Sequence, residues 1–245
     1  MKEIYLERLK DPKERLHLDV FKEILTNLNN GQHVWVGDCH FNDNYKYFIK
    51  ELLLYTSKLN PKPPLYMEMV EASKQPVLDG FKSGHVTQDE LAKCISKNSN
   101  GNDVWCHTPN SIRLLTEIIA ECKILGVPVV GIDCVSGASD WKGQMRERNQ
   151  CWANTIANTG VRGVIFGGIG HSHSAINQTE EGEKGIEGVD TLLGNVFVIR
   201  PATPLRDGVS IRTNPEGAPI TIKSGTLLFP KNYEHYFKPP LRSKL

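Results

Sequence analysis

Two histidines follow glycine-containing turns at the ends of two short apolar segments that lie far apart in the chain. One turn is Gly37-Asp38-Cys39-His40 and the other is Gly168-Ile169-Gly170-His171. Each follows a run rich in β-branched and aromatic residues, which is typical of a buried parallel strand that gives way to a polar turn. We expect the glycine ahead of each histidine to adopt a positive φ, so that the imidazole projects over the sheet edge. The pattern indicates one site, built from two strand ends and suited to catalysis or metal binding.

Three carboxylates also fall at or near the expected carboxyl ends of strands. Asp38 lies in the first turn, Glu68 lies within the apolar segment 65–70, and Asp133 ends the segment 127–133. A carboxylate inside an apolar strand is costly unless it is paired or lies at the strand end, so Glu68 stands out. Because ligands bind at the carboxyl ends of strands in open α/β sheets, we expect these side chains to share a pocket of substrate size.

A histidine of near-neutral pKa that is oriented by carboxylates suits a general base that activates water. We therefore predict a hydrolase in which His40 is the general base, held by Glu68 or Asp38, while His171 and Arg148 stabilise the oxyanion or the leaving group. The alternative for Arg148 is a solvated helix face. The catalytic candidates are His40, Glu68, His171, Arg148 and Asp38, and the substrate-binding candidates are Asp133, His173, Gly37 and Gly170.

Other chemistries remain open around the same residues. His40, His171 and Glu68 are the candidate ligands if a divalent transition metal is bound, and His173 completes a His-x-His pair, although no spacing fixes the metal's identity. The segment 170–174 nearly matches the G-x-S-x-G nucleophile elbow, but a serine replaces its last glycine. Cys39 is a candidate nucleophile beside His40.

Strand and helix patterns alternate along the chain and would position these residues. The strand segments are 33–36, 65–70, 127–133 and 163–170. Amphipathic helices separate them, and alternating βα units predict an α/β fold with a mostly parallel central sheet flanked by helices. The segment 190–230 is β-rich, and we expect its strands to add antiparallel edges. We expect residues 1–245 to form a single domain, with a core at about 16–175 and this C-terminal extension.

The composition of the 245-residue chain is that of an ordinary globular protein, with 39% hydrophobic and 23% charged residues. Its 29 Lys and Arg residues nearly balance 28 Asp and Glu residues, so we expect no nucleic-acid partner. Nowhere do about 18 apolar residues follow one another, so we expect no signal peptide and no membrane span. The expected location is cytoplasmic, with translocation into a host cell by a non-Sec route left open. The six cysteines, which form no Cys-x-x-Cys pair, are expected to be reduced.

Taken together, these residues resemble the superfamily of ChaN-like haem-binding proteins, erythromycin esterases, and the TraB and Tiki proteins. That superfamily carries a G-E-x-H strand end, a glutamate on the second strand, a G-x-P-V strand that ends in aspartate, an R-D-x-x-M/W-A helix start and a final G-x-x-H. The matching residues are Gly37 and His40, Glu68, Gly126-Val127-Pro128-Val129 with Asp133, Arg148 with Trp152-Ala153, and Gly168 with His171. The chain departs from the pattern at Asp38, where glutamate is usual, and at Asn149, where aspartate is usual.

The resemblance implies a shared pocket but no single reaction, since the relatives include a metal-independent esterase, metal-dependent peptidases and haem binders, and related folds occur in bacterial toxins. Hydrolysis of a small-molecule or peptide substrate is the main prediction. One alternative is a translocated bacterial effector or toxin domain that acts on a host target through the same pocket. Another is a non-catalytic haem or metal carrier, for which Tyr45 and Tyr66 are candidate axial ligands.

Overall fold

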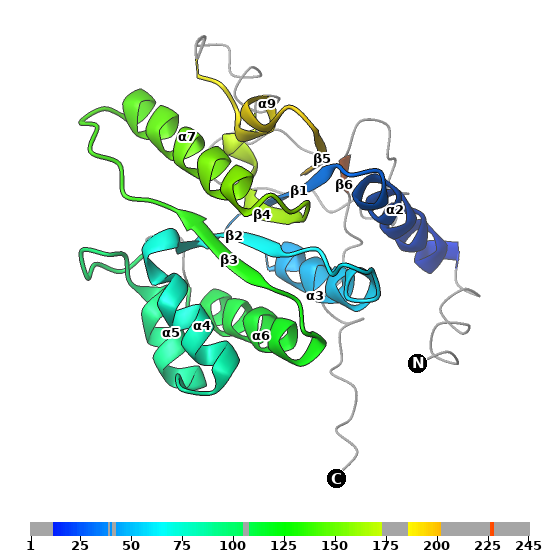
Figure 1. Cartoon of the computed structure of the whole chain (residues 1–245), viewed down its shortest axis with the longest axis horizontal. Helices are drawn as coiled ribbons and strands as arrows, with labels where there is room; N and C mark the ends of the chain where they lie inside the picture. The colour runs from blue at the N-terminus through cyan, green and yellow to red at the C-terminus, as the bar shows by residue number, and fades with distance from the viewer. Residues whose placement is uncertain are drawn as a thin grey trace.

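The computed structural model describes residues 12–38, 40, 43–104, 108–172, 186–201 and 226–227. A parallel sheet forms its centre (Figure 1), with the strand order β3-β2-β4-β1-β5-β6. The strands are β1 (His33–Asp38), β2 (Leu65–Glu71), β3 (Val129–Asp133), β4 (Val164–Gly168), β5 (Val196–Pro201) and β6 (Thr226–Leu227). Each pair of neighbouring strands runs parallel. The predicted α/β fold with a central parallel sheet is confirmed.

The C-terminal strands differ from the prediction. We expected them to add antiparallel edges, but β5 pairs in parallel with β1, and β6 pairs in parallel with β5. The short helix α9 (Val189–Leu193) precedes β5 and contacts both β5 and α7. A crossover helix of this kind lets the chain return to the same end of the sheet, which a parallel strand requires. The other strand segments expected beyond residue 201 lie outside the described residues.

Helices cover both faces of the sheet (Figure 1). One face carries α2 (Pro12–Asn29), α3 (Asn44–Thr56), α4 (Gln75–Ser83), α5 (Gln88–Ser96) and α6 (Pro109–Leu125), and the other carries α7 (Trp141–Thr159) and α9. From β1 to β3 the chain moves toward one edge of the sheet, and after β3 it reverses direction and its helices change face. Right-handed crossover connections require this change.

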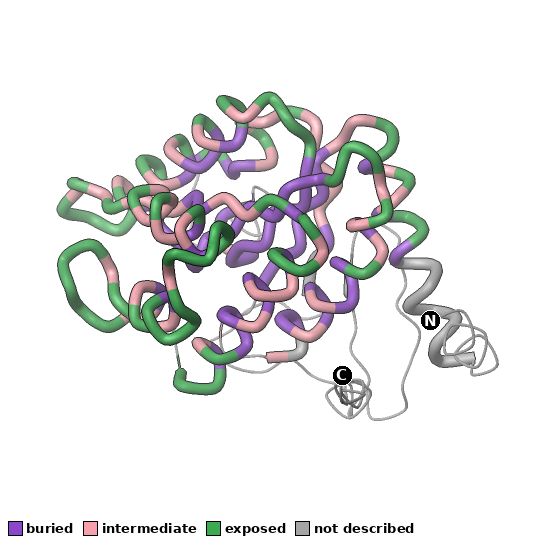
Figure 2. The backbone as a smooth tube through the Cα atoms, turned by 60° about the horizontal axis from the view of Figure 1, so that its bottom comes forward, coloured by how far each residue is buried: buried purple, intermediate pink, exposed green. Residues whose placement is uncertain are grey.

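Successive side chains of a strand point to opposite faces of the sheet, so the strands contribute to two apolar cores, one on each face. Val34 and Val36 of β1 pack in the core beneath α3 and α6, whereas Trp35 packs with Trp152 in the core beneath α7. Figure 2 shows the resulting buried centre, surrounded by exposed loops. Glu68 lies two residues after Tyr66, which belongs to the α7 core, so the period of the strand directs the Glu68 side chain toward α7.

Local signals in the sequence explain where several helices begin and end. Thr87 and Glu90 form a capping box at the start of α5. Thr108 accepts a hydrogen bond at the start of α6, and Gly126 ends that helix in the left-handed conformation. Among the helices described, none combines the length and the apolar character that crossing a membrane requires.

Candidate active site

A cleft of about 810 Å³ opens at the carboxyl ends of β1, β2, β3 and β4. The parallel register of β1 and β4 places Asp38 beside Gly168, so the two histidine turns lie next to each other. Six of the residues singled out from the sequence for chemistry line the cleft together: Asp38, His40, Glu68, Asp133, Arg148 and His171. Gly170 also lines it.

Glu68 is the centre of this cluster. Its side chain is buried, and its Oε2 accepts a hydrogen bond from the backbone N–H of Gly168. Its Oε1 accepts a hydrogen bond from Nη2 of Arg148 at 3.1 Å. The same Oε1 lies 3.8 Å from Nε2 of His40 and 3.6 Å from Nε2 of His171. These partners offset the cost of burying a carboxylate in an apolar strand.

Arg148 reaches from α7 to two carboxylates at once. Its Nε donates to Oδ1 of Asp133 at 2.9 Å, while Nη2 binds Glu68. Trp152 is one helical turn further along α7, and its indole N–H donates to the same oxygen of Asp133 at 2.9 Å. Burial opposes the charge on Arg148, but Glu68 and Asp133 outweigh it and raise the pKa of the guanidinium. Arg148 therefore lies in the cleft as a fixed cation, and the solvated-face alternative does not apply.

His40 is a charged imidazolium in this arrangement. Its Nδ1 lies 3.0 Å from Oδ2 of Asp38, whose side chain is fully buried. Burial works against the charge, but the Glu68 carboxylate and the hydrogen bond to Asp38 outweigh it and raise the pKa of His40 to about 9. Its backbone carbonyl accepts a hydrogen bond from the buried Lys46 at 3.1 Å, which holds the turn in place.

This charge state is incompatible with the role predicted for His40. An imidazolium has no lone pair, so at neutral pH it cannot take a proton from water, but it can give one to a leaving group. The sequence prediction assumed a near-neutral pKa, whereas two carboxylates within 3.0 to 3.8 Å stabilise the charged form. The structure thus favours a general acid at His40.

His171 has the opposite charge state, although it shares Glu68 with His40. Its ring is buried and stacks on Trp152 with ring centres 4.0 Å apart. Burial, followed by the positive charges of Arg148 and His40, lowers the pKa of His171 well below its ordinary value. Its Nδ1 lies 2.6 Å from Oδ1 of Asn149, a fully buried amide on α7. His171 is therefore neutral at physiological pH.

The glycines of the two turns matter for the room that a missing side chain leaves, and not for a positive φ. Neither Gly37 nor Gly170 has a positive φ, so the expected backbone conformation is wrong. A Cβ at Gly37 would lie 2.5 Å from the Ile169 side chain, and a Cβ at Gly168 would lie 3.0 Å from Nε2 of His40. Close packing of β1 against Ile169 therefore requires glycine at position 37, whereas a side chain at position 168 would press on His40. A Cβ at Gly170 would meet no atom within 4 Å.

The metal and haem alternatives gain no support from this geometry. Among the described residues, no three His, Cys, Asp or Glu side chains are arranged to hold a metal ion. The Arg148 guanidinium already occupies the side of Glu68 that faces α7. Tyr45 and Tyr66, the candidate haem ligands, are fully buried. His173 and Cys39 lie outside the described residues.

Some residues at or behind the cleft were assigned no function by the sequence analysis. Asn149 and Trp152 hold His171 from α7, and the spacing of Trp152 four residues after Arg148 on one helix is a signal that points to it. Val135 and Trp141 form an apolar wall and remain 56% and 51% exposed. Large apolar side chains left open beside polar groups are typical of ligand pockets.

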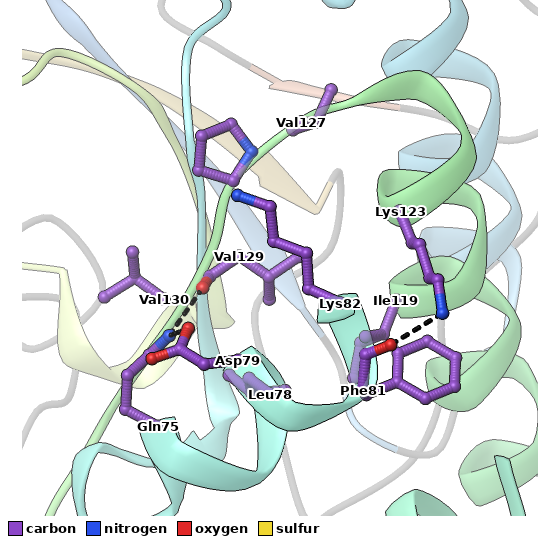
Figure 3. A pocket seen from close by; sticks show the side chains of 11 residues that line it. Gln75, Leu78, Asp79, Phe81, Lys82, Ile119, Lys123, Val127, Val129 and Val130 are labelled. Atoms are coloured by element: carbon purple, nitrogen blue, oxygen red, sulfur yellow. Dashed lines mark hydrogen bonds between the residues drawn. The ribbon is translucent and has the colours of Figure 1, made fainter. Parts of the chain in front are cut away.

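A second, smaller hollow of about 160 Å³ lies between α4, α6 and β3 (Figure 3). Its hydrogen bonds are structural: Lys123 donates to the carbonyl of Phe81, and the side chain of Gln75 donates to the carbonyl of Val129. Gln75 also accepts a hydrogen bond from the N–H of Gly131, so its amide covers the edge of β3. This hollow lacks a cluster of ionisable groups like that around Glu68.

No protein-family model matches the chain, and a search of curated protein sequences found no match. The matches among solved structures have low sequence identity, and two of those described next reach a TM-score of 0.50 or more. The RRSP effector domain of a MARTX toxin from Vibrio vulnificus matches with a TM-score of 0.52 and 15% identity, over 76% of this chain and 36% of that chain. A structure described as bacterial protein toxins gives a TM-score of 0.50 and 13% identity, over 76% and 37%. The type III effector HopBA1 gives 0.48 and 16%, over 69% and 76%.

The two toxin structures show the fold, and this chain spans little more than a third of their length. They do not show membership of the ChaN, erythromycin esterase and Tiki superfamily, which stays an expectation from the sequence motifs.

Proposed function

We propose that this chain is an effector-type bacterial domain that acts on a host molecule by acid–base hydrolysis in the cleft. One observation carries the proposal: His40, Glu68, Arg148 and His171 converge at the carboxyl ends of the strands. The fold shared with a toxin effector domain supports the effector part. The opposite charge states of the two histidines support the acid–base part, because pairs of groups with divergent pKa values are typical of catalytic sites.

The proposed reaction uses each group according to its charge. His40 is the general acid for the leaving group, and Arg148 stabilises the negative charge that develops on the attacked carbonyl oxygen. The general base is one of the two remaining groups, Glu68 or His171. The substrate is an ester or an amide, in a small molecule or a peptide, and a cleft of about 810 Å³ accommodates a ligand of drug size or larger. The apolar wall of Val135 and Trp141 contacts its uncharged part.

Expression inside a eukaryotic host cell tests this proposal. The wild-type domain should inhibit growth, and Glu68→Gln and His40→Gln should grow like cells without the domain, because each removes one group of the cluster. The matched control is Asp89→Asn, which removes a carboxylate from the exposed surface of α5 and should inhibit growth like the wild type. Protein levels and melting temperatures are compared in parallel.

Two results contradict the proposal. The first is a wild-type domain that leaves the growth of the host cell unchanged. The second is full inhibition by folded Glu68→Gln and His40→Gln, which would mean that the effect does not depend on the cleft.

A further inference from the structure

We infer that Asn149 is a positioning residue that holds His171 in a single neutral tautomer, with the proton on Nδ1 and the lone pair of Nε2 directed at Glu68. This inference rests on the proposed hydrolysis and names its general base. Asn149 is fully buried in α7, one residue after Arg148, and it contacts the ring of His171 on the side opposite the cleft centre.

The hydrogen bonds of Asn149 fix its own orientation first. Its Nδ2 lies 2.7 Å from the backbone carbonyl of Glu187. A carbonyl oxygen can only accept, so the amide nitrogen must be the atom that faces Glu187. The amide oxygen of Asn149 therefore faces His171.

The tautomer of His171 follows from that orientation. The amide oxygen of Asn149 lies 2.6 Å from Nδ1, and an oxygen of this kind also can only accept. Nδ1 must then carry the proton, and in a neutral ring Nε2 carries the lone pair. The stacking on Trp152 at 4.0 Å restrains the ring, and a ring flip would break the bond to Asn149.

The lone pair of Nε2 lies among the charged groups of the cleft. Oε1 of Glu68 is 3.6 Å away, beyond hydrogen-bond distance, so the two atoms do not satisfy each other. Glu68 in turn binds Arg148, whose charge, with that of His40, disfavours a proton on His171. The neutral amide at position 149 does not counter this effect, whereas a carboxylate there would stabilise the imidazolium.

In the proposed step, Nε2 of His171 takes a proton from a water molecule as the water oxygen forms a bond to the carbonyl carbon. The bond from that carbon to the leaving group then breaks, and the leaving group takes the proton of Nε2 of His40. One water is consumed, and the acid and the second product are released. Exchange with solvent returns the proton from His171 and reprotonates His40, so both groups regain their starting states.

Nitrogen-15 NMR of the histidine side chains in the purified, substrate-free protein tests the tautomer directly. At neutral pH the wild-type His171 should show a protonated Nδ1 and an unprotonated Nε2. In Asn149→Asp, both nitrogens should be protonated, and growth inhibition should be lost. The matched control is Gln150→Glu, which adds the same charge to the exposed neighbouring position on α7 and should leave both the spectrum of His171 and growth inhibition unchanged.

A wild-type spectrum with a protonated Nε2 on His171 overturns the inference, and it needs no variant, so a variant that fails to fold does not weaken the test. An unchanged tautomer and full growth inhibition in folded Asn149→Asp also overturn it. The two proposals fail in different ways: absent growth inhibition by the wild type rejects the proposed function, whereas the spectrum rejects the assignment of the base.

Discussion

The charged state of His40 should make the stability of the fold decrease as the pH rises from about 6.5 to about 9. In the unfolded chain, His40 is expected to titrate near its ordinary pKa of about 6.5. In the folded chain its pKa is about 9, because Glu68 and Asp38 outweigh the effect of burial. Between these values the folded state binds one more proton than the unfolded state, so the free energy of unfolding falls with pH.

The size of this effect follows from the difference between the two pKa values. Each unit of difference corresponds to about 1.4 kcal/mol, so a rise from about 6.5 to about 9 gives about 3 kcal/mol. The side chain of His40 is 20% exposed, so solvent screens it only in part. This stabilisation is fully present below pH 6.5 and is lost above pH 9, and it is a large share of the stability of a typical domain, which is about 5 to 15 kcal/mol.

Urea denaturation at a series of pH values from 6 to 10 measures the effect. In His40→Gln, the amide still donates to Asp38 but does not titrate, so its free energy of unfolding should vary less with pH than that of the wild type. His85→Gln removes an exposed histidine between α4 and α5 and should keep the slope of the wild type. If the curves of His40→Gln and the wild type run parallel from pH 6.5 to 9, the imidazolium assigned to His40 is refuted.

Two further predictions follow from the contacts of the site. Gly168→Ala should shift the His40 ring slightly, because the new Cβ would lie 3.0 Å from its Nε2; small misplacements of a reacting group lower the rate, so growth inhibition should weaken. Gly137→Ala, whose Cβ meets no atom within 4 Å, should retain full inhibition, and equal inhibition by both variants would contradict the argument. Trp152→Phe removes the donor to Asp133 and should lower the unfolding free energy by about 1 kcal/mol, measured by urea denaturation; an unchanged value would exclude that contribution.

The helices and strands could be predicted from the sequence because the residues that begin or end each of them lie within it or next to it. The capping box at Thr87, the proline after Thr108 and the glycine at position 126 each act within one turn of a helix. The order of the strands does not follow in the same way, since it depends on which strands pair across long stretches of chain. The prediction of antiparallel edges was wrong for that reason: strand patterns within 190–230 do not show whether a helix such as α9 precedes the strand.

The residues of the candidate site could be named from the sequence, but their charge states could not. Asp38, His40, Glu68 and His171 stand out because polar groups at the ends of apolar strands need partners. A pKa, however, depends on distances of 3 to 4 Å and on burial, which exist only once the strands are aligned. Nothing in the spacing of the residues indicates that two carboxylates approach the ring of His40, so the sequence analysis assumed a near-neutral pKa for it.

The two histidines share Glu68 but differ in charge state. Oε1 of Glu68 lies at nearly the same distance from Nε2 of both rings, 3.8 Å for His40 and 3.6 Å for His171, so the distance to Glu68 cannot separate them. Burial and the second partner of each ring do: His171 is the more deeply buried ring and has only the amide of Asn149, whereas His40 has the carboxylate of Asp38. Once His40 is charged, its positive charge adds to that of Arg148 and disfavours a second imidazolium at His171. The cluster therefore holds a charged and a neutral imidazole beside the same carboxylate, and the proposed reaction uses them as its acid and its base.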